Sequence, residues 1–383
     1  MVKILLGWEK VDPDQADNEG RTPLSHAAGS GISGVVKMLL ERGEVNPDKP
    51  DNDGRTPLSH AAWSGISGAV KILLKRGEVN PDKADDEGRT PLSHAAHSGR
   101  EGVVKMLLER GEVNPHKPDN NGRAPLSYAA ESGRSEVLKM LLERGEVNLD
   151  ESDNDGRAPL SYAAQWGGED MVKMILGRGE VNPDKPDNYG IAPLSYAADL
   201  GRSGVLKMLL ERGEVNPDKP DNEGRTPLLY AAYWGNEGAV KMLLERVEVN
   251  PDKPGNNGRA PLSHAAGSGI SSVVKMLLER GEVNPDKPDN RGRTPLSYAS
   301  RDGESYQTAE YRKVVEMLLG REEVIPDKPD NDGRTPLSYA AEYGFEGAVG
   351  MLLGREEVDT NKPDNLRRTP LMYATSSAHE GVL

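Results

Sequence analysis

Short apolar blocks recur along the chain at a nearly constant interval, and polar segments rich in Pro, Gly, Asp and Asn separate them. The tripeptide Thr/Ala-Pro-Leu marks this interval. Its proline stands at Pro23, Pro57, Pro91, Pro125, Pro159, Pro193, Pro227, Pro261, Pro295, Pro336 and Pro370. Neighbouring prolines are 34 residues apart, except for the 41 residues between Pro295 and Pro336. A fixed period of this length is typical of repeat proteins, in which each unit buries its apolar face on its neighbours.

The first half of one unit, residues 51–84, predicts a short helix. Thr56 fits the N-cap position, and Pro57 fits the first helical position, where a missing N–H costs nothing. Gly65 fits the end of this helix. The apolar residues that share one helical face are Leu58, Ala61 and Ala62. Small residues on this face allow the next unit to approach closely.

The second half of the unit predicts a second helix and a loop. The buried face of this helix is formed by Val70, Leu73 and Leu74, and Ala69 lies near its start. Gly77 fits its C-terminal stop. The following stretch, Gly-Glu-Val-Asn-Pro-Asp-Lys, is too short for anything but an extended loop or hairpin.

Two of these local signals are lost in some units, which predicts uneven stability. The capping threonine is replaced by Ala124, Ala158, Ala192 and Ala260, and each loss is expected to cost about 1 kcal/mol. The glycine after the second helix is replaced by Val247, Glu322 and Glu356. If that position requires a positive φ, the β-branched Val247 is strained by ~1–2 kcal/mol.

The unit resembles the ankyrin repeat. The residues that carry the resemblance are Gly54, Thr56-Pro57-Leu58, Ala61-Ala62, Gly65 and Leu73-Leu74, repeated down the chain. The resemblance implies an all-α fold, an ankyrin-repeat solenoid with helix-turn-helix plus a loop or hairpin in each repeat. The chain departs from the family in its period of 34 residues, where 33 is usual, and in Ser59, which stands where the family has His. This variant is also similar to arrays in large fungal multidomain proteins that carry a NACHT-type nucleotide-binding domain.

The period divides the chain into a single array over residues 1–383. Residues 1–16 are a partial N-terminal repeat that begins inside a second helix, residues 17–363 are ten full repeats, and residues 364–383 are a partial C-terminal repeat. Neither end carries the polar capping repeat that arrays usually need. We therefore expect a piece of a longer protein, with a short natural protein as the alternative. Apolar end layers would offer surfaces for self-association.

Repeat nine, residues 289–329, carries a seven-residue insertion at 304–310. The inserted sequence can extend the second helix by about two turns at its start, or Thr308 can cap a shorter extension. One interpretation is a neutral surface insertion. The other is a second contact site formed by Tyr306 and Tyr311.

Charge and composition narrow the function. The net charge of −14 disfavours nucleic acid and anionic membranes, and it favours a protein partner with a basic face. The chain has no cysteine, so it forms no disulfide bond, and this is compatible with a reducing compartment. We expect a cytoplasmic protein without cofactor or metal. No set of nucleophile, base and acid stands out, so we do not expect an enzyme.

Two polar residues recur at fixed positions. A histidine lies two residues after the Pro-Leu pair at His26, His60, His94 and His264, and tyrosine replaces it in other repeats. Since a flat ring with a polar edge is common to both, we interpret the position as a packing position. An arginine follows the turn glycine in most repeats. Its side chain is expected to pair with the Asp residues of the turns, and the alternative is a guanidinium stripe that meets an acidic partner segment.

Positions that vary between repeats are the best candidates for binding, because the fold places the same demands on each repeat. They lie before the turn glycine and after the Ala-Ala pair, and the resemblance places them in a concave groove. The candidate partner-binding residues are Trp63, His97, Glu131, Trp166, Tyr189, Leu200, Tyr233, Trp234, Arg291 and Tyr343. Aromatic residues dominate binding hot spots, although each ring could instead cover the neighbouring repeat. The sequence thus favours a scaffold for protein–protein interaction. The alternative is a structural spacer or a self-packing sensor array in a larger signalling protein.

Overall fold

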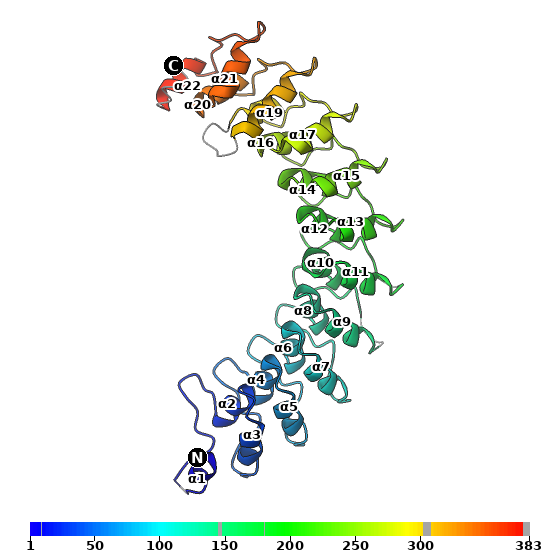
Figure 1. Cartoon of the computed structure of the whole chain (residues 1–383), viewed down its shortest axis with the longest axis vertical. Coiled ribbons are helices and arrows are strands. Elements are labelled where there is room, and N and C mark those ends of the chain that lie inside the picture. Colours follow the sequence, from blue (N-terminus) through cyan, green and yellow to red (C-terminus); the bar gives the residue numbers. More distant parts are fainter. Residues whose placement is uncertain (9, 145–147, 180, 302–307, 378–383) are drawn as a thin grey trace. The chain divides into compact units, whose positions relative to one another are not determined.

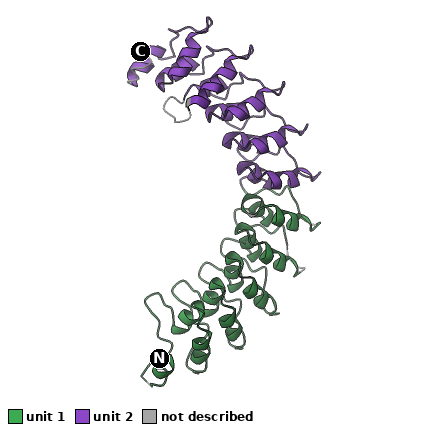
Figure 2. Cartoon of the chain, viewed as in Figure 1, with its two compact units in different colours: residues 1–188 green, residues 189–383 purple. Residues whose placement is uncertain are grey.

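Pairs of antiparallel helices follow one another along the chain in the computed structural model (Figure 1). The structure describes residues 1–8, 10–144, 148–179, 181–301 and 308–377, and over these ranges it contains helices, turns and loops without a strand. Contacts divide the chain into two compact units, residues 1–188 and residues 189–383 (Figure 2). Over the ranges that are described, no helix is both long and apolar enough to cross a membrane.

Unit 1 contains the helices up to residue 176. They are α1 (Val2–Leu5), α2 (Pro23–Gly29), α3 (Ser33–Leu40), α4 (Pro57–Ser64), α5 (Ser67–Leu73), α6 (Pro91–Ser98), α7 (Glu101–Leu108), α8 (Pro125–Glu131), α9 (Ser135–Leu142), α10 (Pro159–Tyr162), the π-helix η1 (Ala163–Gly167) and α11 (Glu169–Leu176). The first helices of successive repeats pack side by side, α2 on α4, α4 on α6 and α6 on α8, and the second helices form a parallel row from α3 to α11 (Figure 1).

Unit 2 repeats this arrangement. Its helices are α12 (Pro193–Asp199), α13 (Ser203–Leu210), α14 (Pro227–Trp234), α15 (Glu237–Leu244), α16 (Pro261–Gly267), α17 (Ser271–Leu278), α18 (Pro295–Ala299), α19 (Thr308–Leu319), α20 (Pro336–Glu342), α21 (Glu346–Leu353) and α22 (Pro370–Ser376). The first helices α12, α14, α16, α18, α20 and α22 again form one row. The all-α prediction and the helix-turn-helix unit are confirmed.

The first helix of repeat two begins and ends as the sequence predicts. The Thr56 hydroxyl accepts a hydrogen bond from the Ser59 N–H, Pro57 follows at the first helical position, and Gly65 ends α4 with a φ of 80°. The predicted apolar faces of α4 and α5 are buried. The side chain of Ser59 also contacts the Thr56 hydroxyl at 3.1 Å, so both polar groups are satisfied inside the stack.

Most repeats without the capping threonine leave that serine without a hydrogen-bond partner. Helices α8, α10, α12 and α16 have no side-chain hydrogen bond at their N-cap. In three of them the buried serine hydroxyl has no partner: Ser161, Ser195 and Ser263. Burial of an unpaired polar group adds to the cost of the missing cap. The uneven local stability predicted from the sequence therefore has a second cause.

The prediction for the end of the second helix is wrong. Helix α5 ends at Leu73, and Gly77 lies in the following turn without a positive φ. Added β-carbons at Gly43, Gly77 and Gly111 would meet nothing within 4 Å. Val247 occupies the same position, is almost fully exposed and also lacks a positive φ. No conformational strain therefore follows from Val247, or from Glu322 and Glu356.

Within the described residues, the second helix of repeat nine is about one turn longer than in most other repeats. Helix α19 begins at Thr308 and has 12 residues, whereas most of the other second helices have eight. Inserted residues 304–307, with Tyr306, lie outside the described residues. Tyr311 is not an exposed contact residue, because it is buried and its hydroxyl donates a hydrogen bond to the Gly267 carbonyl at 3.1 Å. Its ring covers Gly269, where an added β-carbon would lie 2.6 Å from it.

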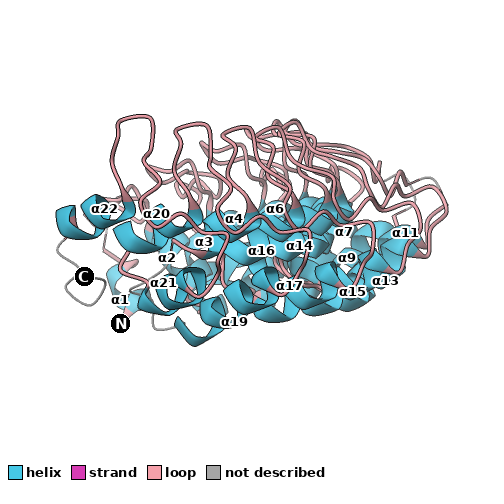
Figure 3. Cartoon of the chain, turned by 90° about the horizontal axis from the view of Figure 1, so that it is seen from above, coloured by secondary structure: helices cyan, strands magenta, loops and turns pink. Residues whose placement is uncertain are grey.

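The loops between repeats extend to one side of the helices (Figure 3) and are joined by polar side chains instead of strand pairing. The Lys83 ammonium donates to the Asp48 carbonyl at 2.7 Å, and the Asn80 N–H donates to the Asp48 carboxylate at 2.8 Å. The same pairing recurs between Lys117 and Asp82 and between Lys287 and Asp252. Where it is present and described, the Asn-Pro-Asp-Lys segment thus holds its loop on the preceding one.

Candidate functional site

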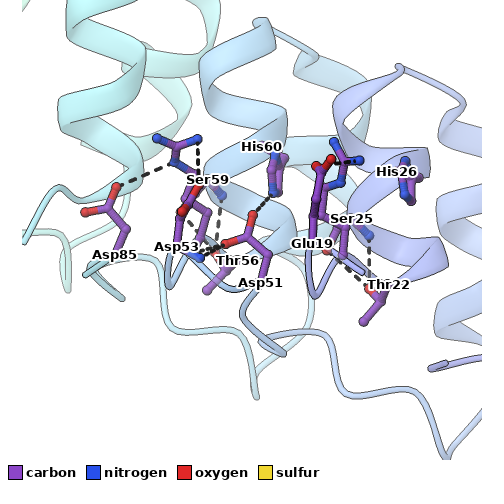
Figure 4. Close-up of polar contacts among 12 residues, drawn as sticks. Glu19, Thr22, Ser25, His26, Asp51, Asp53, Thr56, Ser59, His60 and Asp85 are labelled. Atoms are coloured by element: carbon purple, nitrogen blue, oxygen red, sulfur yellow. Dashed lines mark hydrogen bonds and ion pairs between the residues drawn. The ribbon is translucent and has the colours of Figure 1, made fainter. Parts of the chain in front are cut away.

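An aspartate opens nearly every repeat and organises the turn before the first helix (Figure 4). In repeat two, Asp51 Oδ1 accepts hydrogen bonds from the N–H groups of Asp53 and Arg55, at 3.0 and 2.8 Å. Its other oxygen, Oδ2, lies 2.7 Å from His60 Nε2 on α4. The carboxylate therefore fixes the turn with one oxygen and the helix with the other.

The His or Tyr at the recurrent ring position forms a hydrogen bond with this aspartate in several repeats. The packing interpretation is confirmed where the ring is buried, as at His94, Tyr128 and Tyr298, and there its polar atom also reaches the carboxylate. The Tyr128 hydroxyl donates to Asp119 at 2.5 Å, and the Tyr298 hydroxyl donates to Asp289 at 2.7 Å. Burial and the neighbouring Asp119 raise the pKa of Tyr128, so the hydroxyl remains a donor.

The predicted pairing of the arginine ladder with the turn aspartates is confirmed in several repeats. Arg89 and Arg225 donate to Asp85 and Asp221 through Nε, at 3.1 and 2.7 Å. Elsewhere the guanidinium turns to the end of the first helix, as between Arg123 and Glu131. Most of these guanidinium groups also lie over the tyrosine rings, at 3.9–5.0 Å from their centroids in the closest cases.

Repeat eight breaks this network. Gly255 stands where the other repeats have aspartate, and no carboxylate from its own turn reaches His264. The imidazole of His264 is buried, and its Nδ1 has no hydrogen-bond partner. Burial, followed by the nearby Arg259 and Arg225, lowers the pKa of His264 to about 3. The ring is therefore neutral at physiological pH.

A pocket of about 560 Å³ lies beside this break, within unit 2. It is lined by Asp199, Glu223, Arg225, Leu229, Tyr230, Tyr233, Trp234, Gly255, Asn256, Asn257 and His264. Leu229 contributes an apolar side chain to the floor of the pocket. Most other repeats have serine at the equivalent position. Apolar walls with a few convergent polar groups are typical of binding sites.

Two of the predicted partner-binding residues lie at this pocket. The rings of Tyr233 and Trp234 meet edge to face at a centroid distance of 4.9 Å, and Tyr233 also meets His264 at 5.6 Å. The Trp234 indole N–H donates to Asp199 at 2.7 Å. Both rings remain substantially exposed, at 43% and 61%. They form a fixed apolar surface that is open to solvent.

A second aromatic cluster lies in unit 1, at the ends of α4 and α6. Trp63 stacks on His97 at a centroid distance of 5.6 Å and an interplanar angle of 21°. His97 in turn meets the edge of Tyr128, and its Nδ1 lies 3.1 Å from the Ser132 hydroxyl. Burial lowers the pKa of His97. Trp63 keeps about half of its surface exposed, so the cluster is both ordered and accessible.

The remaining predicted residues are scattered. Glu131 is engaged by Arg123, and Tyr343 receives a hydrogen bond from Arg301 at 3.2 Å. Those that stay exposed are Trp166 on η1, Tyr189, Leu200, Arg291 and Tyr343. The structure brings together Trp63 with His97 and Tyr233 with Trp234, and does not gather the others into these two clusters.

Two residues that shape the pocket are not identified from the sequence. Gly255 and Leu229 carry no recognisable chemistry by themselves. Gly255 and Leu229 differ from their equivalents in most other repeats, and this difference is the sequence feature that could have identified them. The prediction rests on positions whose exposed side chains vary between repeats, whereas Gly255 affects the pocket through the side chain that it lacks.

Comparison with known proteins agrees with the repeat geometry. A family model for ankyrin repeats matches at residues 1–83, 67–119, 78–151, 112–187, 160–254, 245–319 and 305–383. No curated protein sequence matches. Among solved structures, the human ASB11 ankyrin repeat domain is 27% identical with a TM-score of 0.51, over 58% of this chain and 98% of that domain. The family matches cover the length of the chain, which therefore belongs to the ankyrin repeat family.

Proposed function

We propose that this chain is a non-enzymatic scaffold that binds a protein partner along the ends of its first helices, the groove side in ankyrin proteins. Ankyrin repeats are generally protein–protein interaction modules. The observation that carries the proposal is the pocket of unit 2, where Tyr233 and Trp234 stand exposed beside an apolar floor. Large rings held in place by neighbours lose little entropy on binding, which makes them effective anchors.

The cluster of Trp63 and His97 supports a second anchor point in unit 1. These rings are held against each other, and exposed surface on Trp63 remains for a partner. The remaining candidates, Glu131, Trp166, Tyr189, Leu200, Arg291 and Tyr343, contribute to the rim in this proposal. An interface of aromatic anchors with a polar rim is the usual composition of a binding surface.

The charge of the chain suggests the partner's character. With a net charge of −14, the chain attracts a partner with a basic face, and the association should weaken as ionic strength rises. A cytoplasmic location is part of the same proposal, and imaging of the tagged chain in its own cell would test it.

The test is affinity capture from an extract of the chain's own cell, with mass spectrometry of the bound proteins. The parent is compared with Trp63→Ala/His97→Ala and with Tyr233→Ala/Trp234→Ala. The matched control is Val247→Ala, which removes an exposed apolar side chain after the second helix α15. All four proteins must show the same helical circular dichroism.

A partner that the parent and control retain and that either double variant loses supports the proposal. Loss of a hot-spot ring costs about 2 kcal/mol or more, which is roughly a thirtyfold loss of affinity. Equal capture by all four proteins, or by none, contradicts it. That result favours the alternative of a spacer or self-packing sensor array.

A further inference from the structure

The missing carboxylate of repeat eight leaves hydrogen-bond donors that its neighbours use. In repeat seven, Asp221 accepts hydrogen bonds from the N–H of Glu223 and of Arg225, both at 2.8 Å. It also accepts from Arg225 Nε and the Tyr230 hydroxyl, both at 2.7 Å. Four donors therefore converge on the carboxylate position in an intact repeat.

The equivalent donors of repeat eight are only partly satisfied. Asn257 Oδ1 takes the place of one carboxylate oxygen and accepts the Arg259 N–H at 2.9 Å. The N–H of Asn257 itself has no acceptor among the described residues. The His264 side chain is 9% exposed, and no described residue forms a hydrogen bond with its ring. An orphaned polar group this deeply buried costs stability unless a ligand satisfies it.

The charges around the ring favour an anion. Arg259 and Arg225 are the charged groups that act on His264, and no carboxylate acts with them. Arg259 has no aspartate in its own turn and forms no ion pair among the described residues; its Nη2 donates to the Ser263 carbonyl at 3.1 Å, and its guanidinium lies over Tyr298 at 3.9 Å. An incoming carboxylate would therefore meet Arg259, whereas Arg225 is already paired with Asp221 and Glu223.

The carboxylates that line the pocket are already engaged. Glu223 lies on the exposed rim and pairs with Arg225 at 3.2 Å. Asp199 accepts the Trp234 indole N–H. A β-carbon fits at Gly255, since it would make only ordinary contacts, the closest at 3.4 Å to the Glu223 carbonyl.

We infer that this pocket binds the side chain of an aspartate or glutamate from a partner protein, whose carboxylate takes the place of the aspartate that repeat eight lacks. The carboxylate accepts hydrogen bonds from His264 and from the Asn257 N–H. Neighbouring residues of the same segment pack on Tyr233 and Trp234. The inference rests on the proposed function, and it adds one acidic anchor to a partner segment whose overall charge is basic.

The test uses random twelve-residue peptides displayed with their C-terminus fused, so that only side chains supply carboxylates. The full chain is the target, together with Gly255→Asp, Gly255→Ala and His264→Phe. Gly255→Asp supplies the missing carboxylate from within. Gly255→Ala adds only the β-carbon and is the matched control. His264→Phe keeps the ring and removes its nitrogens. Enriched sequences are made as C-terminally amidated peptides, each with a Glu→Gln or Asp→Asn partner, and their affinities are measured.

The expected consensus for the parent and Gly255→Ala has an acidic residue at a fixed position beside an apolar one. Neutralising that residue should weaken binding about tenfold or more, because a hydrogen-bonded charge is lost. Gly255→Asp should lose the same peptides while its melting temperature rises, which excludes misfolding as the cause. His264→Phe should retain binding with the acidic preference reduced.

Peptides that lack an acidic residue, or that bind Gly255→Asp as well as the parent, would overturn the inference and leave the scaffold function intact. Equal affinity of the acidic and neutralised peptides would do the same. If the parent enriches no peptide, the acidic anchor is refuted, and capture of whole proteins decides the scaffold function separately.

Discussion

Replacing Ala158 by threonine should stabilise repeat five, and the size of the effect follows from the structure. Ala158 has φ −83° and ψ 161°, nearly the same as the capping Thr90 of repeat three at −82° and 165°. Thr90 accepts the Ser93 N–H at 3.2 Å and contacts the Ser93 hydroxyl at 3.2 Å. In repeat five the equivalent hydroxyl, Ser161 Oγ, is buried without a partner.

The substitution restores two interactions. A capping hydroxyl contributes about 1 kcal/mol. A partner for a buried hydroxyl contributes about another 1 kcal/mol. The threonine methyl fits, because the capping threonines of the other repeats are fully buried in the same surroundings. We therefore expect Ala158→Thr to raise the free energy of local opening by about 2 kcal/mol, and Thr90→Ala to lower it by a similar amount.

Amide hydrogen exchange is the suitable assay, since long arrays do not unfold in a single two-state transition. Exchange of the α10 and η1 amides should slow roughly thirtyfold in Ala158→Thr, as 1.4 kcal/mol corresponds to tenfold. Amides of α4 serve as the internal control and should not change. A faster exchange in α6 of Thr90→Ala, together with unchanged exchange in α10 of Ala158→Thr, would refute this reasoning. The missing cap would then not limit the local stability of repeat five, and the argument from the unpaired Ser161 hydroxyl would fail.

Three further predictions concern stability. Arg367 has a φ of 62° at the position of the turn glycine. Arg367→Gly should therefore relieve ~1 kcal/mol of strain and raise the free energy of local opening of α22, which is measured by exchange of its amides. Val247→Gly should not stabilise, and denaturant unfolding should show a loss of up to about 1 kcal/mol because glycine enlarges the unfolded ensemble. Burial raises the pKa of Asp85, but the bonds from His94 and from the Arg89 backbone outweigh it and lower that pKa to about 2. This stabilisation is present above about pH 4 and is lost as the pH falls toward 2, so Asp85→Asn should cost about 2 kcal/mol at pH 6 and much less at pH 2.

The periodic part of the fold could be predicted from the sequence, because its causes are local. The threonine cap, Pro57 at the first helical position and Gly65 at the end act within one helix, and each is where the pattern places it. The end of the second helix could not be predicted in this way. A glycine near a helix end suggests a positive φ, but α5 ends at Leu73, before Gly77 is reached.

The candidate site could be predicted only in part. Exposed aromatic residues at varying positions were visible, and Tyr233 and Trp234 do meet at a pocket. Which of the ten candidates gather, and which are engaged by a neighbour as Glu131 is, depends on contacts between repeats. The aspartate network also spans nine residues within a repeat, so its meaning required the distance between Asp51 and His60.

Departures from the repeat differ in consequence according to what the lost group does. Val247 replaces a glycine that nothing requires, and the fold is unchanged around it. Arg367 replaces a glycine at a positive φ, so the cost is conformational and local. Gly255 removes the carboxylate that accepts several hydrogen bonds in other repeats, and His264 Nδ1 is buried without a partner. Of the three, only this last change leaves unsatisfied polar groups beside a pocket with exposed aromatic rings. A loss that destabilises a repeat and opens a site of this kind is better explained by binding than by drift, because a β-carbon at Gly255 would meet only ordinary contacts and so does not prevent a return to aspartate.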